Sequence, residues 1–250
     1  MHVGQADWDA QWRGVEIDFE APLKEQETAR WLAQAVLVER LFGGFSGLRV
    51  IELGAGRGIN GLLYARAGAN VTLLDKSAVA LDQARELYAR YGVEVTLLEA
   101  DLFKGPPPGS EPFDLSMSFG LCEHFLGGKR TEVVRKHIDF VRTGGVAMIG
   151  VPNKWAPAYR AWMGVLKRRG TWTLGTEEPF SVSELRRIAS EIGGAALEPA
   201  YGSFLASLVS HGLNQAQFKL GYQPSRIPQR RIPVLDRFAY ELLVPIVRVT

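Results

Sequence analysis

A short apolar run that ends directly in alternating glycines constrains this chain more than any other feature. Val50–Leu53 is typical of a buried strand, glycines follow at positions 54, 56 and 58, and a helical pattern begins there. Glycine lets the backbone turn sharply and approach a ligand without a Cβ in the way. The start of a helix adds unpaired N–H groups and a partial positive charge. The run therefore predicts a ligand cradle at the carboxyl edge of a sheet.

Strand-like runs and helical patterns then alternate along the chain. The strands are predicted at 48–53, 70–75, 93–98, 113–119 and 145–151, with helices at 58–67, 77–91 and 131–141. Such alternation with short connections predicts an α/β fold, a doubly wound and mostly parallel sheet with helices on both faces. Ser181 and Glu184 fit a capping box that starts a further helix, which runs to about residue 192.

The segments around this core predict three regions. An amphipathic helix over 22–42 belongs to an N-terminal helical cap, and a stretch rich in tryptophan and proline after the fifth strand is typical of a lid. In the tail we expect a helix over 203–218 and a strand over 241–249, where Pro245 favours a sheet edge or a helix end. The expected regions are a cap over 1–45, a core over 46–202 with a lid insertion over 153–180, and a tail over 203–250 that closes the sheet or the pocket.

Composition excludes several classes of protein. The formal net charge of +2 gives no general basic field, so we expect no nucleic-acid partner. The single cysteine, Cys122, excludes an internal disulfide and a cysteine-based zinc site. No apolar run reaches the ~18 residues of a membrane span, and the polar first residues do not resemble a signal peptide. A cytoplasmic protein is the expectation.

Two carboxylates follow later strands in an order that suits one ligand. Asp75 ends the second predicted strand, where its carboxylate can accept hydrogen bonds from both hydroxyls of a ribose. Asp101 follows the third predicted strand, where it can meet the exocyclic amine of an adenine. Together with the glycine run they predict a site for an adenosyl ligand.

A dinucleotide site is the competing interpretation of the same residues. Positions 56–61 fit G-x-G-x-x-G, and Asp75 follows at about the right distance. The motif should open at the first glycine after the strand, however, and counted from Gly54 its third glycine position falls on Ile59. Glu52 also places a carboxylate where a pyrophosphate would be repelled and an ammonium group attracted. These observations favour S-adenosylmethionine over a nicotinamide cofactor.

Over about residues 48–192 the chain resembles the class I S-adenosylmethionine-dependent methyltransferases. The resemblance rests on Glu52 to Gly58, Asp75, Ala100-Asp101-Leu102 and the glycine pair 144–145. It implies the Rossmann-like methyltransferase fold, with S-adenosylmethionine as cofactor and S-adenosylhomocysteine as product. Glu52 and the glycines would hold the methionine portion, Asp75 the ribose and Asp101 the adenine. The cofactor-binding residues expected are Glu52, Gly54, Ala55, Gly56, Gly58, Asp75, Lys76, Asp101, Leu102 and Phe119.

The segment after the fourth predicted strand holds the candidate catalytic residues, His124 and Glu123. His124 could take a proton from a hydroxyl, phenol or amine; alternatively it packs under the lid and bonds the backbone. We expect no metal, because the first glutamate of an E-x-x-E-H element would fall on Gly120. We expect Cys122 to be buried and His137, in a charged helix, to be solvated.

The lid is where substrate choice is expected. Its aromatic rings and one amide suit an aromatic or natural-product-like acceptor, and the alternative is that the rings only pack the lid onto the core. The candidate substrate residues are Asn153, Trp155, Tyr159, Trp162 and Trp172. The resemblance further implies that Trp8 and Trp12 belong to a segment that covers the pocket.

These observations predict a methyltransferase that acts on a small molecule, with a hydroxyl acceptor and His124 as base in the simplest version. Two alternatives stay open. One is a methyltransferase for RNA or protein, and the other is a non-catalytic protein that binds an adenosyl ligand.

Overall fold

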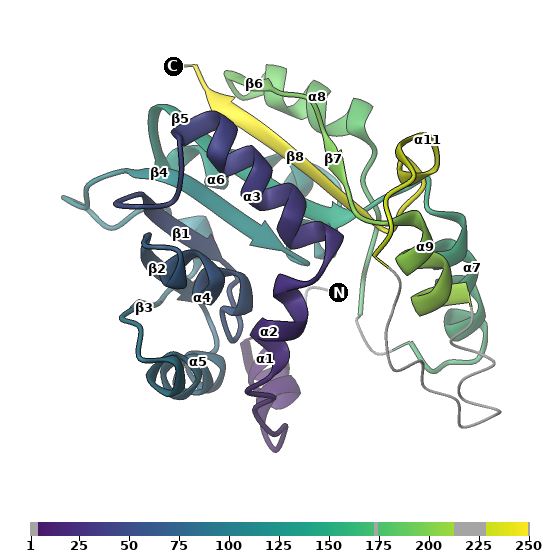
Figure 1. Cartoon of the computed structure of the whole chain (residues 1–250), viewed down its shortest axis with the longest axis horizontal. Helices are drawn as coiled ribbons and strands as arrows, with labels where there is room; N and C mark the ends of the chain where they lie inside the picture. The colour runs from purple at the N-terminus through teal and green to yellow at the C-terminus, as the bar shows by residue number, and fades with distance from the viewer. Residues whose placement is uncertain (1–4, 173–174, 213–228, 250) are drawn as a thin grey trace.

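The computed structural model describes residues 5–172, 175–212 and 229–249. In this part of the chain an eight-stranded sheet has the order β3-β2-β1-β4-β5-β8-β6, and β7 also pairs with β8 (Figure 1). The first five strands are parallel, whereas β8 runs antiparallel to β5, β6 and β7. The strands are β1 Arg49–Leu53, β2 Asn70–Asp75, β3 Thr96–Glu99, β4 Phe113–Phe119, β5 Val141–Pro152, β6 Gly194–Ala196, β7 Ala200–Tyr201 and β8 Glu241–Arg248.

The helices before β5 largely follow the predicted alternation, and shorter ones close the structure. They are α1 Gln5–Trp12, α2 Ala21–Gln26, α3 Ala29–Phe42, α4 Ile59–Arg66, α5 Ala78–Tyr91, α6 Gly128–Phe140, α7 Pro157–Arg168, α8 Val182–Glu191, α9 Phe204–Ser207 and α11 Pro233–Asp236. Short 3-10 turns cover Leu102–Lys104 and Cys122–His124, and a π-helical turn covers Leu208–Gly212. Of the predicted helix over 203–218, positions 213–218 lie outside the described residues. No helix in the described ranges is long and apolar enough to cross a membrane.

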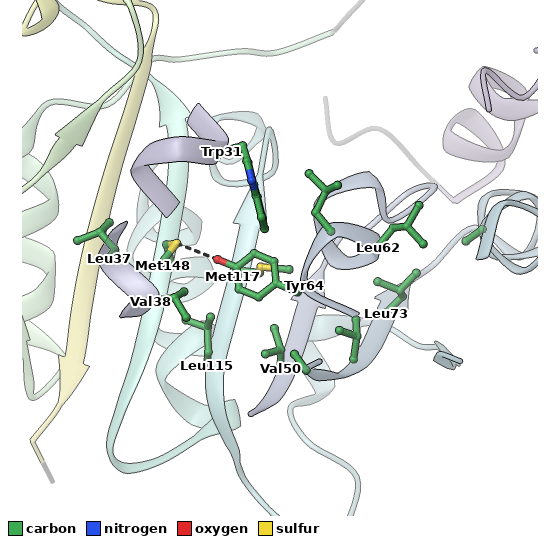
Figure 2. Packing of buried hydrophobic residues seen from close by; sticks show 14 of the residues in the cluster. Trp31, Leu37, Val38, Val50, Leu62, Tyr64, Leu73, Leu115, Met117 and Met148 are labelled. Carbon is green, nitrogen blue, oxygen red and sulfur yellow. Dashed lines mark hydrogen bonds between the residues drawn. The ribbon is translucent and has the colours of Figure 1, made fainter. Parts of the chain in front are cut away.

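Two cores form on opposite faces of the sheet because successive strand residues point to opposite sides. Figure 2 shows the first core, where Trp31, Leu37 and Val38 of α3 and Leu62 and Tyr64 of α4 pack against the sheet. There the Tyr64 hydroxyl donates to Met148 Sδ at 3.7 Å. The second core packs α6 and α8 on the other face. The doubly wound α/β fold predicted from the sequence is therefore confirmed.

The predicted helix over 22–42 is two helices rather than one. Thr28 separates them with an extended backbone, and its side chain accepts a hydrogen bond from Trp31 N at 3.1 Å. Thr28 is therefore the N-cap of a separate helix, α3, because its hydroxyl satisfies a free N–H group of the first turn. The sequence pattern of apolar residues continues across the break and so did not reveal it.

Pro245 lies inside the sheet, so the expected edge or helix end is wrong. β8 sits between β5 on one side and β6 and β7 on the other. The Pro245 carbonyl accepts from Leu197 N at 2.8 Å, so its nitrogen faces that same side. There β6 has ended at Ala196 and β7 has not begun. The missing N–H therefore faces Leu197, in the stretch between β6 and β7 where the regular pairing with β8 is interrupted.

Only one of the two hydrogen bonds of the predicted capping box forms at the start of α8. Ser181 Oγ accepts from Glu184 N at 3.2 Å, as predicted. The Glu184 carboxylate, however, binds Arg130 of α6, with Nε to Oε1 at 2.8 Å. A buried arginine from another element competes successfully for the carboxylate, since a charge-assisted pair is stronger than a bond to a backbone amide.

Candidate functional site

A cavity of about 220 Å³ lies at the carboxyl ends of the parallel strands. The loop after β1, the end of β2, the residues after β3 and the end of β4 each contribute to its wall, and α1 covers it. Ligands of open α/β sheets bind at this edge. The lining residues are Trp8, Trp12, Gly54, Ala55, Gly56, Leu74, Asp75, Lys76, Ala100, Leu102, Phe119, Gly120 and Leu121. We call this space the outer cavity.

The loop after β1 is shaped by its glycines. Gly54, Gly56 and Gly58 all have positive φ, between 54° and 65°, which favours glycine. A Cβ on Gly54 would stand 2.6 Å from Leu121 Cδ1, and one on Gly56 would stand 2.7 Å from the indole of Trp12. A side chain at these positions would fill the cradle that the backbone forms. The outer cavity thus fits a ligand that needs close approach to the chain, as the adenosyl cofactor does.

Asp75 fixes this loop and lines the outer cavity. Its Oδ2 accepts from Gly56 N at 2.7 Å, and its Oδ1 accepts from Ser77 N at 2.9 Å. Burial raises the pKa of the Asp75 carboxyl, although the backbone donors at Ser77 and Gly56 oppose that rise. Each oxygen of a carboxylate can accept more than one hydrogen bond, so both keep room for ribose hydroxyls.

The structure does not bring all ten expected cofactor residues to the cavity wall. Glu52 is buried beneath the loop, where its Oε2 accepts from Gly61 N at 2.8 Å and burial raises its pKa to about 8. Asp101 accepts from Phe103 N and pairs with Lys76 Nζ at 2.9 Å. Gly58 packs on Leu73. The remaining expected residues line the outer cavity: Gly54, Ala55, Gly56, Asp75, Lys76, Leu102 and Phe119.

The N-terminal helix α1 is fastened over this cavity. Ser77 Oγ donates to Asp9 Oδ1 at 2.5 Å, and Gln83 Nε2 donates to the Trp12 carbonyl at 3.0 Å. The guanidinium of Arg57 stacks on the Trp12 ring, with its Cζ 5.1 Å from the ring centre. Trp8 and Trp12 both line the wall.

A second, smaller cavity of about 30 Å³ lies next to the first, and we call it the inner cavity. Phe119 and Gly120 line both spaces. The inner wall also includes side chains from α3, β5, β7 and the start of β8, none of which the sequence had indicated as functional. The lining residues are Arg30, Ala33, Phe119, Gly120, Glu123, Gly150, Val151, Pro152, Tyr201, Gly202, Tyr240, Glu241, Leu242 and Leu243.

Glu123 is the predicted catalytic residue that the structure places on the inner wall. Its side chain is only 2% exposed, and within the described residues no donor reaches its Oε2. Burial raises the pKa of this carboxyl to about 8, and the nearby Glu177 raises it further while Arg130 lowers it. The group is therefore poised to exchange a proton near neutral pH.

Arg30 is an inner-wall residue that sequence reasoning missed. Its Nε and Nη2 donate to Glu25 at 2.7 and 2.5 Å, and its Nη1 lies 3.4 Å from Glu241 Oε1. In the sequence it is one of several charged residues of an amphipathic helix. Nothing in that pattern distinguishes it, because its role depends on a strand that follows two hundred residues later.

His124 lines neither cavity. Its Nδ1 donates to the Thr176 carbonyl at 2.9 Å, and its ring meets Trp8 edge-on at 5.4 Å between centres. Thr176 belongs to residues 175–180, a strap that returns from the lid to the core. The structure thus shows the backbone contact that was the alternative to a base, while the other ring nitrogen keeps its lone pair.

Two neighbouring expectations have clear outcomes. Cys122 is buried, as predicted. The expectation that His137 is solvated is wrong: it is fully buried, its Nδ1 donates to Val133 O and its Nε2 accepts from Ser118 Oγ, both at 2.8 Å. Burial lowers its pKa to about 4. Helical spacing puts this position of a charged helix on the face that packs against the sheet.

The candidate substrate residues of the lid line neither cavity, although Tyr159 packs on Tyr240 of the inner wall. Asn153 donates both amide hydrogens to the carbonyls of Arg237 and Ala239, and its Oδ1 accepts from Trp155 N, so its polar atoms are engaged. Trp155 is 60% exposed. Tyr159, Trp162 and Trp172 pack on one another and on His211 and Tyr240. In the parts that the structure describes, no cluster of three histidine, cysteine or carboxylate side chains could hold a metal.

Comparison with known proteins identifies a methyltransferase domain in the chain. Residues 50–145 match the family model of a methyltransferase domain. The chain is 30% identical over 106 residues to EEF1A lysine methyltransferase 3 of Mus musculus; the match covers 42% of this chain and 39% of that protein. The chain thus spans about two fifths of that relative's length.

Two solved structures share the fold over nearly the whole chain. Magnesium protoporphyrin IX methyltransferase from Synechocystis PCC 6803, with bound S-adenosylhomocysteine, has a TM-score of 0.61 at 16% identity, covering 96% of this chain and 92% of that one. An S-adenosylmethionine-dependent methyltransferase from Mesorhizobium loti has a TM-score of 0.58 at 20% identity, covering 89% and 99%. Residues 50–145 therefore form a methyltransferase domain, and the chain as a whole has the fold of S-adenosylmethionine-dependent methyltransferases.

Proposed function

We propose that this protein transfers the methyl group of S-adenosylmethionine to a small molecule that enters the inner cavity. The observation that carries the proposal is that Phe119 and Gly120 line both cavities. A donor in the outer cavity and an acceptor in the inner one would meet at these two residues. Methyl transfer mainly requires that the two reactants be held in line, and adjoining cavities supply that arrangement.

The outer cavity suits the donor. When bound, S-adenosylmethionine supplies a methyl group on a positively charged sulfur. The glycine loop would hold its methionine portion, and the Asp75 carboxylate would accept hydrogen bonds from its ribose. The rings of Trp8 and Trp12 would exclude water. Phe119 would lie at the passage to the acceptor.

The inner cavity suits a compact acceptor or the narrow end of a larger one. A space of about 30 Å³ is roughly twice what one buried water needs. The similar fold of magnesium protoporphyrin IX methyltransferase, whose name gives a small-molecule substrate, supports the same class of acceptor. Because the lid tryptophans line neither cavity, a contact between them and an aromatic acceptor stays a prediction.

For a hydroxyl acceptor, His124 is the proposed base. What supports this role is the hydrogen bond from Nδ1 to Thr176, which leaves Nε2 as the nitrogen that can take a proton. Because His124 lines neither cavity, the hydroxyl would have to lie beyond the cavity walls, near Trp8, whose ring meets the imidazole. A His124→Gln variant should then bind S-adenosylhomocysteine normally and lose most of its methyl transfer to alcohols or phenols.

The first test is calorimetric titration of the purified protein with S-adenosylhomocysteine and, separately, with NAD⁺ and NADP⁺. We expect micromolar binding of S-adenosylhomocysteine alone. Transfer of radiolabelled methyl from S-adenosylmethionine to a panel of small molecules is the second test. Binding of a nicotinamide cofactor, or no binding of S-adenosylhomocysteine, would overturn the proposal.

A protein substrate is the second candidate, favoured by the similarity to EEF1A lysine methyltransferase 3. That similarity covers less than half of either chain. Incubation with radiolabelled S-adenosylmethionine and purified elongation factor 1A distinguishes the two. Label in the protein band would favour this candidate, and label only in the small-molecule fraction would favour the first.

A further inference from the structure

Carboxylates outnumber cations around the inner cavity. Glu123 and Glu241 line it, Glu177 lies close enough to affect Glu123, and Arg30 is the guanidinium on the wall. Arg30 is engaged by Glu25 and Glu241 through the contacts given above. These two carboxylates already neutralise the charge of Arg30, so Arg30 does not serve as the counter-ion of Glu123.

Glu123 has no cationic partner of its own in the described structure. The nearest cation that influences it, Arg130, directs its donors to Glu184 and to the carbonyls of Phe125, Glu178 and Pro179. The backbone of Glu123 is held, since its carbonyl accepts from Glu178 N at 2.9 Å. A fixed backbone therefore carries a buried carboxyl that lines the cavity, and its Oε2 has no hydrogen-bond partner within the described residues. Buried polar atoms are nearly always hydrogen-bonded, so an unused one at a cavity wall indicates a ligand that donates.

The remaining walls favour a positive charge as well. Phe119, Tyr201 and Tyr240 contribute aromatic side chains to the lining. The ring of Phe119 already has the Arg30 guanidinium over it, with Cζ 5.8 Å from the ring centre. Aromatic faces attract cations by their quadrupole, and the attraction strengthens when the cation is desolvated.

We propose that the acceptor is an amine, bound through an N–H donor to the Glu123 carboxylate and between the aromatic walls of the inner cavity. This inference rests on the proposed function and names its substrate class. An ammonium group would pair with the ionised form of Glu123, whereas an alcohol would bring no charge to it. The volume of the cavity admits an amino group and a short carbon stem, so a primary or unhindered secondary amine fits.

The reaction balances with the groups at hand. The ammonium gives one proton to the ionised Glu123 carboxylate, which leaves a neutral amine with a free lone pair. That lone pair forms a bond to the methyl carbon, and the carbon–sulfur bond breaks with its electrons remaining on sulfur. The products are an N-methylammonium and S-adenosylhomocysteine, and Glu123 later releases its proton to water.

Several titratable groups face Glu123 and set the pH at which it can accept this proton. Arg130 of α6 favours the ionised form of Glu123, whereas Glu177, within the strap, favours the protonated form. The hydroxyls of Tyr159 on α7 and Tyr240 before β8 also feel its charge. Because the pKa of Glu123 is raised to about 8, the rate with an amine should increase with pH through this value.

The test compares paired probes on the full-length protein loaded with S-adenosylhomocysteine. The probes are propylamine and propanol, benzylamine and benzyl alcohol, and N-methylbenzylamine and benzyl methyl ether. We expect the amines to raise the melting temperature more than their oxygen partners do. If no amine stabilises the loaded protein more than its partner, the amine inference is overturned, while measured binding of S-adenosylhomocysteine would leave the proposed function standing.

A matched pair of variants then tests Glu123 itself. Glu123→Gln keeps the shape and removes the charge. Glu178→Gln makes the same change at an exposed side chain of the strap, at the residue whose backbone N–H bonds the Glu123 carbonyl. For Glu123→Gln we expect the stabilisation by amines to vanish, kcat/KM to fall about a hundredfold for an amine that is methylated, and the affinity for S-adenosylhomocysteine to stay within twofold. Glu178→Gln should match the wild type. Stabilisation by amines that survives in Glu123→Gln would refute the role of this carboxylate.

Discussion

Oδ2 of Asp75 accepts a 2.7 Å hydrogen bond from the backbone nitrogen of Gly56, which ties the end of β2 to the glycine loop after β1. Two residues nineteen positions apart thereby share the wall of the outer cavity. The backbone N–H groups of this positive-φ loop have no partners in a helix or a sheet, so the loop needs a side-chain acceptor such as Asp75.

Replacing Asp75 with alanine should therefore weaken cofactor binding. The variant loses both the ribose acceptor and the bond that positions Gly56, so we expect the dissociation constant of S-adenosylhomocysteine to rise at least tenfold. Calorimetric titration measures it. Asp82→Ala, at an exposed position of α5, is the control and should bind as the wild type does. Equal affinities in the two variants would contradict the assignment of Asp75.

Removing the ring of Trp12 should speed release of the product. The indole lies against Gly56 and carries the stacked guanidinium of Arg57, so alanine at this position would open the cover of the outer cavity. We expect the dissociation rate of tritiated S-adenosylhomocysteine, chased with unlabelled ligand, to rise about tenfold. Trp155→Ala removes an exposed ring and should leave that rate unchanged. A normal rate in Trp12→Ala would show that α1 does not gate the cavity.

The stability of the fold should fall in mild acid through His137. Its pKa is about 4 in the folded protein, below the ordinary value of 6.5, so the unfolded chain binds the proton more readily between these two values. The free energy of unfolding should decrease as the pH falls from 6.5 toward 4, by roughly 1.4 kcal/mol for each unit of pKa difference. Urea unfolding of the wild type and of His137→Gln measures the effect. The variant should be less stable at pH 7 and lose less on acidification.

Glu123 should give the opposite dependence. Its pKa of about 8 in the fold lies above the ordinary value of 4.5, so the folded state binds the proton more tightly and loses stability as the pH rises from 4.5 through 8. Glu123→Gln removes this loss, and its free energy of unfolding relative to the wild type should increase between pH 5 and pH 9. Glu178→Gln should show no such trend. A flat difference for Glu123→Gln would mean that this carboxyl is ionised in the fold at neutral pH.

Arg130 should be a main support of the strap. It binds Glu184 through Nε at 2.8 Å, donates to Glu178 O at 2.9 Å and stacks on Phe180 with its Cζ 3.5 Å from the ring centre. Arg130→Met removes the cation from the partly buried Glu184 carboxylate and the donor from the Glu178 carbonyl, and should cost roughly 2 kcal/mol of unfolding free energy. Arg187→Met, from an exposed pair with Glu191 on α8, should cost less than about 0.5 kcal/mol. Urea unfolding of both variants makes the comparison.

The local sequence determined the parallel half of the sheet and most of the outer cavity. Apolar runs that end in glycine or aspartate mark the strand ends, and the carboxyl ends of parallel strands meet at one edge whatever the tertiary details. Gly54, Gly56 and Asp75 could thus be assigned from their positions along the chain, and all three line the outer cavity. The expectation for Trp8 and Trp12 came from the family resemblance, and both also line it.

The tertiary structure alone decided the inner cavity. Arg30 of α3 meets Tyr240 and Glu241 there because β8 inserts beside β5, and no local pattern encodes a contact between segments two hundred residues apart. The same long-range packing buries His137, lets Pro245 occupy an interior strand, and leaves the lid tryptophans off both walls. Periodicity shows which face of an element is apolar, but the partner that covers this face is set by the assembled fold.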